Sequence, residues 1–148
     1  MGLQKAAAQP FVKVIVDTCA WSQFLRRNRS PIDSVAQAVT RLVRADAVQL
    51  LGPIRQEPLS GAQPSQRFAQ LKEYLRFYPN LLLEEEDDEM AASYYNRLRE
   101  RGLQSNGTDL IICAAAVRRG FKIFTTDTDF AAYAKYIPIK LHRPHGVL

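Results

Sequence analysis

Acidic residues follow several apolar segments of this chain, in positions where their side chains could meet. Asp17 ends the β-branched run "FVKVIVD", and Asp127 follows the apolar run "FKIFTT". Glu57 comes after a third apolar run, and Asp109 stands just inside the helix expected after "SNGT". Parallel strands end at a common edge of their sheet, so we expect the four carboxylates to converge there. Asp is also common in turns and helix caps, so one such acid alone would indicate little.

A cluster of carboxylates without histidine or cysteine favours a hard divalent cation. Magnesium and manganese prefer carboxylate and water oxygens, and a bound cation would relieve the repulsion among like charges. Two such ions could activate a water and stabilise the leaving oxygen of a phosphodiester. The expected cofactor is therefore Mg²⁺ or Mn²⁺, held by Asp17, Glu57, Asp109 and Asp127.

Polar residues beside these acids are expected to support the site. They are Thr125, Asp129, Thr108 and Asn106. Thr108 is the expected N-cap of its helix, and Asp129 is expected to cap the next helix or to hold the site indirectly. Asn106 and the neighbouring Ser105 could position a metal-bound water.

The length and charge of the chain limit the classes of protein to which it can belong. With 148 residues and 47% hydrophobic content, we expect one globular domain over residues 11–148, preceded by a flexible extension over residues 1–10. The formal net charge of +5 suits a polyanionic partner such as a nucleic acid. Arginines that could bind the phosphates of such a partner are Arg26, Arg27, Arg29 and Arg55.

Cysteine usage and the N-terminal sequence favour a cytoplasmic setting. Cys19 and Cys113 form no CxxC motif, and both are expected to pack as small apolar side chains. The start "MGLQKAAAQP" lacks an apolar segment of signal-peptide length, and no stretch is long enough to span a membrane. His142 and His145 lie in the C-terminal tail, where a structural or incidental role is expected.

Apolar runs alternate with helical patterns, which is typical of the α/β class with a parallel sheet. We expect strands over residues 11–17, 47–54, 81–84, 121–126 and 137–141. Helices are expected over residues 18–28, 30–46, 64–78, 85–102, 105–120 and 127–136. Ser30 and Pro31 are the expected start of the second helix, and the run "EEEDDE" is expected to begin the helix over 85–102 rather than to bind metal.

These motifs, in this order, resemble those of the PIN-domain nucleases, and among them the VapC-type toxins of toxin–antitoxin modules. The similarity extends from Phe11 to Leu141. "VIVDTCAW" resembles the segment of the first acid, "RQEPLSG" the short glutamate motif, "GTDLIICAAAVRRG" the segment of the third acid, and "FTTDTDF" the closing motif. The resemblance implies that Asp17, Glu57, Asp109 and Asp127 are the catalytic and metal-binding residues, with Thr125 in support.

The resemblance also implies a fold and an activity. The expected fold is a three-layer α/β/α sandwich, and the expected activity is that of a magnesium- or manganese-dependent endoribonuclease. VapC-type proteins usually cleave transfer or ribosomal RNA, form homodimers and are inhibited by a VapB-type antitoxin. One departure from a simple helical glutamate motif is Pro58, which directly follows Glu57 and would place that glutamate at a helix start.

Other functions remain open at this level. One alternative is a noncatalytic PIN-like module that binds RNA or protein, and another is an RNA-processing nuclease without an antitoxin. A phosphoryl-accepting receiver domain would also place an acid after its first strand. It would need a second acid beside Asp17 and a well-placed lysine, which "DTCAW" does not provide.

Overall fold

A three-stranded parallel sheet lies at the centre of the protein. The computed structural model describes residues 12–26 and 30–144, so the extension expected over residues 1–10 lies outside the described residues. The strands are β1 (Val14–Val16), β2 (Val48–Gln49) and β3 (Lys122–Phe124), in the order β2-β1-β3. Val14 pairs with Val48 on one side and with Lys122 on the other. The parallel sheet expected from the sequence is confirmed.

Single bridges extend this sheet at both edges, where the sequence predicted further strands. Leu50 pairs with Asn80, and Ile123 pairs with Leu141, both in parallel orientation. The segment over 81–84 forms no strand, and Leu82 is 85% exposed. Pro138 interrupts the segment over 137–141, where it lacks the N–H that a ladder requires. Both predictions of full strands were therefore wrong.

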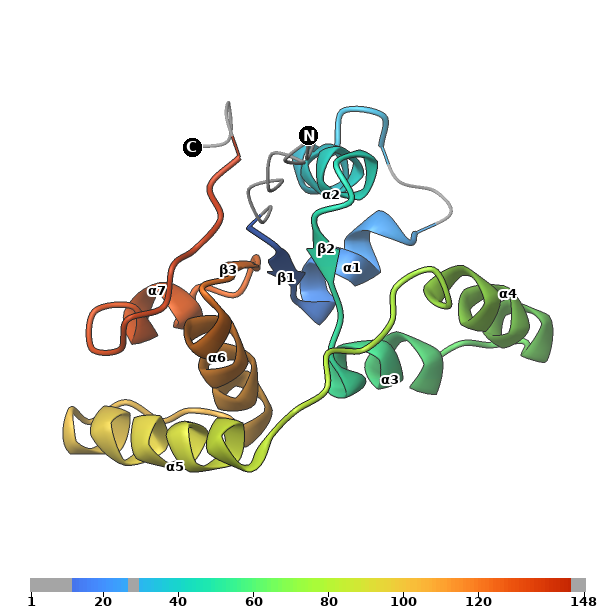
Figure 1. Ribbon diagram of the computed structural model, residues 1–148. Helices are drawn as coiled ribbons and strands as arrows, with labels where there is room; N and C mark the ends of the chain where they lie inside the picture. Colours follow the sequence, from blue (N-terminus) through green and yellow to red (C-terminus); the bar gives the residue numbers. More distant parts are fainter. Residues whose placement is uncertain (1–11, 27–29, 145–148) are drawn as a thin grey trace, which may run out of the picture.

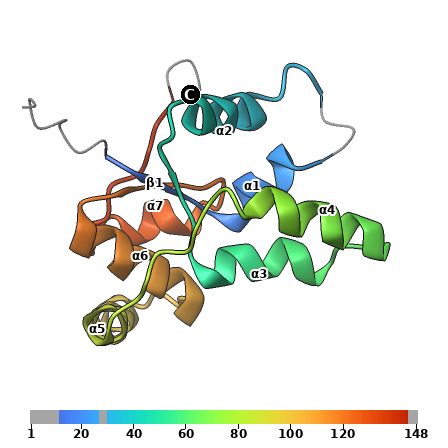
Figure 2. The same ribbon diagram turned by 45° about the vertical axis from the view of Figure 1, so that its right-hand side comes forward.

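Seven helices surround the sheet in the described part of the chain (Figure 1). They are α1 (Thr18–Phe24), α2 (Ser34–Arg44), α3 (Gly52–Ser60), α4 (Ser65–Leu75), α5 (Glu85–Glu100), α6 (Gly107–Arg119) and α7 (Asp129–Tyr133). In Figure 1, α5, α6 and α7 lie to one side of the sheet, and α1, α3 and α4 lie to the other. Figure 2 shows α3 and α4 running side by side. The α/β class and its helical layers are confirmed.

The starts of α2 and α3 differ from the prediction. The second helix begins at Ser34, where Asp33 is the N-cap and accepts a hydrogen bond from the Ala36 amide at 3.0 Å. The expected start at Ser30 and Pro31 was wrong because an acid closer to the apolar face caps the helix. The first part of helix α3 was not predicted, and a helix was expected only from Glu57 on, since the sequence "GPIRQEPLS" contains glycine and two prolines. Its first proline occupies the first turn, where the missing N–H costs nothing.

The core joins the sheet to both groups of helices. Ile15, Ile123, Leu98 and Phe130 are fully buried in one continuous cluster. Cys113 also lies there with no exposed surface, as predicted, and burial raises the pKa of its thiol. No described helix is long and apolar enough to cross a membrane.

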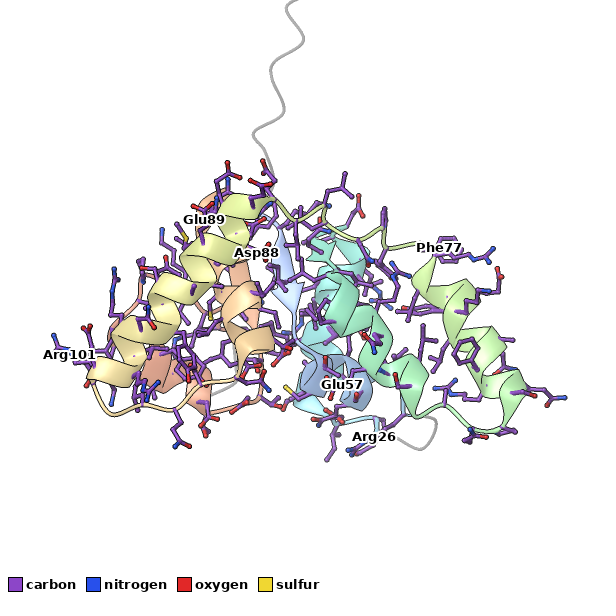
Figure 3. The ribbon with its side chains drawn as sticks, turned by 90° about the horizontal axis from the view of Figure 1, so that it is seen from below. Arg26, Glu57, Phe77, Asp88, Glu89 and Arg101 are labelled. Atoms are coloured by element: carbon purple, nitrogen blue, oxygen red, sulfur yellow. The ribbon has the colours of Figure 1, made fainter. Side chains whose placement is uncertain are left out.

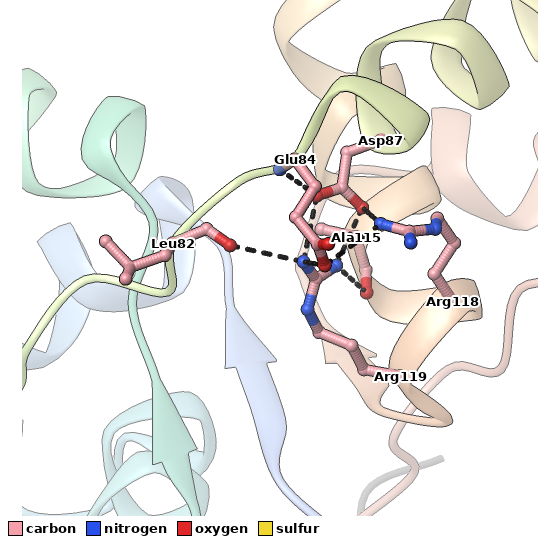
Figure 4. Close-up of polar contacts among 6 residues, drawn as sticks. All are labelled: Leu82, Glu84, Asp87, Ala115, Arg118 and Arg119. Atoms are coloured by element: carbon pink, nitrogen blue, oxygen red, sulfur yellow. Dashed lines mark hydrogen bonds and ion pairs between the residues drawn. The ribbon is translucent and has the colours of Figure 1, made fainter.

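Asp87 is fully buried near the start of α5 and is held by two arginines from the end of α6 (Figure 4). Its Oδ1 accepts from Arg118 at 2.8 Å and from Arg119 at 2.7 Å. Its Oδ2 accepts from the Glu84 amide at 2.8 Å, which completes a capping box. These hydrogen bonds hold the pKa of Asp87 well below its ordinary value. The run "EEEDDE" thus begins a helix, as predicted, and also clamps α5 to α6.

We expect Asp87→Ala to destabilise the fold. It removes several charge-assisted hydrogen bonds, so the free energy of unfolding should fall by about 2 to 3 kcal/mol. Because the folded state lowers the pKa of Asp87, the wild-type advantage should be complete above about pH 5 and should decrease as the pH falls through about 4 and below. Urea unfolding at pH 7 and pH 3 measures both effects. Asp88→Ala, at an exposed position one residue later, is the control, and an equal loss in both variants would contradict the prediction.

Candidate active site

Asp17 sits at the carboxyl end of the central strand and is only 8% exposed. Its backbone N–H donates to the Phe124 carbonyl at 2.8 Å, which continues the ladder between β1 and β3. Its side chain caps α1, because Oδ1 accepts from the Thr18 amide at 2.8 Å. The strand and the helix together fix the orientation of this carboxylate, as the sequence predicted for its position at the sheet edge.

Thr125 connects the first acid to the closing motif. Its hydroxyl donates to Asp17 Oδ2 at 2.9 Å and accepts from the Asp127 amide at 3.0 Å. Asp127 Oδ1 accepts in turn from the Asp129 amide at 2.9 Å. Asp127 therefore stabilises the turn into α7, and the expectation that Asp129 would cap this helix was wrong. The supporting role predicted for Thr125 has a direct geometric basis.

Cys19 takes part in the same network, which the sequence did not predict. Its Sγ lies 3.7 Å from Asp17 Oδ2 and 3.3 Å from Thr125 Oγ1, and it accepts from the Thr126 amide at 3.3 Å. The thiol donates to Asp17 Oδ2, the same oxygen that accepts from the Thr125 hydroxyl. Purely apolar packing was the wrong expectation for Cys19. Its position two residues after Asp17, on the first turn of α1, was the available signal.

Asp109 lies in the first turn of α6, partly buried. The helix is capped by Asn106, whose Oδ1 accepts from the Thr108 amide at 2.8 Å, so Thr108 is not the N-cap. Burial raises the pKa of Asp109 to about 6, with further increases from the charges of Asp17, Asp127, Asp129 and Glu57. A helix N-terminus favours a negative charge, but here burial and like charges outweigh it. The other predicted acids therefore lie close enough to Asp109 to raise its pKa.

Glu57 lies within α3 rather than at a helix start, and Pro58 is accommodated near the end of that helix. The prediction that Pro58 would place Glu57 at the start was wrong, because α3 begins at Gly52 and continues through Pro58, although that proline cannot donate a backbone hydrogen bond. The Glu57 side chain is exposed and borders a pocket of about 250 Å³ together with Thr108 of α6. Figure 3 shows it between the two groups of helices. Glu57 thus lies at the rim of the candidate site.

The arginines expected to bind RNA have different surroundings. Arg26 is exposed and lies on the same side of the molecule as Glu57 in Figure 3. Arg55 instead donates to Asn80 Oδ1 at 2.8 Å and to the carbonyls of Leu75 and Tyr78, which ties α3 to the end of α4. Its geometry is that of a structural residue. Arg27 and Arg29 lie outside the described residues.

Tyr133 of α7 is a second residue that sequence reasoning missed. It is 2% exposed, and burial raises its pKa to about 12, with contributions from Asp109, Asp129 and Asp127. Its ring packs 5.5 Å from that of Phe130. Tyr133 therefore forms an uncharged wall behind the acids, and the spacing of aromatic residues in "DFAAY" could have indicated a buried face. His142 packs edge-on against Phe124, with ring centroids 5.7 Å apart, and His145 lies outside the described residues.

The donor set fits a divalent cation of the magnesium type. All the converging groups are carboxylates, and the pKa of Asp109 is raised partly by the charges that a cation would neutralise. Among the described residues, no three acidic, histidine or cysteine side chains are already arranged to hold an ion. Magnesium usually retains several waters and takes only one or two carboxylates directly, so such an arrangement is not required.

Comparison with known proteins agrees with this geometry. A family model described as "PIN domain" matches residues 14–136. Ribonuclease VapC11 of Mycobacterium tuberculosis and VapC ribonuclease Mb1587 of Mycobacterium bovis are each 30% identical to this chain over 126 residues, which cover 82% of this chain and 92% of theirs.

Solved structures share the fold. FitAcB from Neisseria gonorrhoeae aligns with a TM-score of 0.71 at 19% identity, covering 90% of this chain and 99% of that chain. VapBC2 from Rickettsia felis, bound to a DNA fragment of its promoter, aligns with a TM-score of 0.70 at 14% identity, covering 87% of this chain and 96% of that chain. The matched span and the order of the acidic motifs lead to one conclusion: this chain belongs to the PIN domain family.

Proposed function

We propose that this protein is a metal-dependent endoribonuclease that serves as the toxin of a toxin–antitoxin pair. The observation that carries the catalytic part is the convergence of acids at one edge of the sheet. Thr125 joins Asp17 to the Asp127 amide, and burial together with the charges of the neighbouring acids raises the pKa of Asp109. The choice of RNA is supported by the curated relatives, which are named as ribonucleases. The role as a toxin is supported by the VapBC structures that share the fold.

Each residue of the site has a distinct proposed role. Asp17, Asp109 and Asp127 hold Mg²⁺ or Mn²⁺, and Glu57 contributes from the rim. Thr125 and Cys19 keep the Asp17 carboxylate in place through Oδ2. A divalent ion bound there supplies an activated water and neutralises charge on the phosphodiester. Tyr133 closes the buried side of the site and limits the access of water to Asp109.

The proposed partners are an RNA and an antitoxin. Transfer or ribosomal RNA is the proposed substrate class. The proposed role of Arg26 is to hold a phosphate, and its position on the same side as Glu57 in Figure 3 supports this. A VapB-type antitoxin and a second copy of the chain are the proposed protein partners. The similar structures of VapBC2 and VapBC-5 support the antitoxin.

The first prediction concerns the central acid. Asp17→Asn keeps the shape of the side chain but removes its charge, so RNA cleavage in Mg²⁺ should fall by at least about 100-fold. Gel analysis of total cellular RNA incubated with purified, antitoxin-free protein measures this. EDTA should abolish the wild-type activity. Discrete fragments that persist in EDTA or in the variant would contradict the mechanism, and a folded wild type that cleaves under no condition would favour a binding module.

The second prediction concerns stability in the absence of metal. Because the folded state raises the pKa of Asp109 to about 6, its ionised form opposes folding above that pH. In EDTA at pH 7.5, Asp109→Asn should therefore stabilise the protein by roughly 1 to 2 kcal/mol, and the gain should shrink at pH 5. Mg²⁺ should raise the melting temperature of the wild type more than that of the variant. Asp88→Asn, in the first turn of α5, should show neither effect.

The third prediction concerns Thr125. Thr125→Val removes the hydroxyl that joins Asp17 to the Asp127 amide, so cleavage should fall by roughly 10- to 100-fold. Thr125→Ser keeps the hydroxyl and should retain most of the activity. Titration of Mg²⁺ in the cleavage assay should show a weaker apparent metal affinity for the valine variant. Equal activity of the valine and serine variants would rule out the positioning role.

A further inference from the structure

A polar pocket of about 540 Å³ lies at the end of α5 and along the loop that leads to α6. It is lined by Tyr95, Arg99, Gly102, Leu103, Gln104 and Ser105. In Figure 3, Arg101 marks this end of α5, whereas Asp88 and Glu89 lie at the other end of the helix. Ser105, at the wall of the pocket, directly precedes Asn106, the N-cap of the helix whose first turn carries Asp109.

The pocket carries polar groups that the protein itself does not use. Ser105 Oγ is buried and has no hydrogen-bond partner among the described residues. The side chains of Arg99 and Gln104 are exposed and have no polar partner in the described part of the chain. Leaving a buried hydroxyl unpaired is unfavourable, so a group outside this chain is expected to complete its hydrogen bond.

The chemistry of these side chains matches that of a nucleotide. Tyr95 is 40% exposed and offers a ring on which a base can stack. The amide of Gln104 and the hydroxyl of Ser105 can both donate to and accept from a base edge. Arg99 offers a guanidinium to a phosphate. Recognition of an unpaired RNA base uses an aromatic ring for stacking and polar groups that hydrogen-bond to the base edge. A nearby cation can bind the adjoining phosphate.

The pocket is also within reach of the reacting phosphate. Ser105 and Asp109 are four residues apart in the chain, so their Cα atoms lie within about 15 Å of each other. Asn106 lies between them and caps α6, which fixes the pocket relative to the acid. A short single-stranded segment of RNA can extend from one to the other.

We propose that this pocket binds one base of the RNA substrate near the cleaved bond and sets a nucleotide preference at that position. Tyr95 stacks on the base, Gln104 and Ser105 read its edge, and Arg99 holds an adjacent phosphate. The inference rests on the proposed nuclease function and adds a determinant of specificity to it.

Cleavage of a random-sequence RNA pool, followed by sequencing of the products, tests this proposal. The wild type should show a preference for certain bases at one position near the cut. Tyr95→Leu and Gln104→Ala should each reduce that preference by about tenfold while metal-dependent cleavage continues. Phe77→Leu and Gln37→Ala change an exposed aromatic residue and an exposed glutamine elsewhere, and both should keep the preference.

The outcomes of this experiment distinguish a failure of the base-binding pocket from a failure of the nuclease function. A wild type that cuts without base preference, or variants that keep the full preference, would overturn the pocket and leave the nuclease intact. If the wild type cleaves nothing, the nuclease function fails. Binding of the same pool in EDTA to Asp17→Asn protein, with and without Gln104→Ala, then tests the pocket independently. Selection of the same sequences in both forms, or of none in either, would overturn it.

The Ser105→Ala variant tests whether the Ser105 hydroxyl binds a base of the RNA or a structural water. The variant should lose base preference without a fall in melting temperature, because the wild-type hydroxyl has no partner among the described residues. A lower melting temperature with unchanged preference would show that a bound water completes the hydrogen bond, and would overturn the role assigned to Ser105.

Discussion

The hydrogen bond between Thr125 and Asp17 is the contact on which the site depends. These residues are 108 positions apart, and only the parallel pairing of β1 with β3 brings them together. The Thr125 hydroxyl gives its proton to the carboxylate and receives the Asp127 amide, so one side chain orients two acids. A hydroxyl can do both at once, whereas a carboxylate in its place could only accept.

Two aspartates in the first turns of α5 and α6 differ in how their negative charge is compensated. Asp87 is fully buried, but two arginines compensate it, and its pKa is held well below its ordinary value. Burial raises the pKa of Asp109 to about 6, and the charged groups that raise it further are all acids. The first carboxylate stabilises the fold, and the second opposes it at neutral pH. Repulsion of this kind is typical of functional sites, where a ligand supplies the missing countercharge.

Several parts of the site were predictable because local patterns determine them. An acid directly after a β-branched run ends a strand, so Asp17 and Asp127 could be placed at one edge. Helix α3 was not predictable, because glycine and two prolines disfavour a helix that is nevertheless formed. The role of Cys19 was also missed, because cysteine is usually an apolar core residue and its contacts come from a segment more than a hundred residues away.

By itself, the sequence determined the α/β class, the order of the acidic motifs and the family to which they point, because hydrophobic periodicity and acids at strand ends are local properties. Only the tertiary structure decided which groups touch. It placed Glu57 within a helix, joined Cys19 to Thr125, paired Asp87 with two arginines and left Ser105 Oγ without a partner. The reason is physical: hydrogen bonds and charge interactions act over a few ångströms in space, and the separation of residues along the chain does not determine that distance.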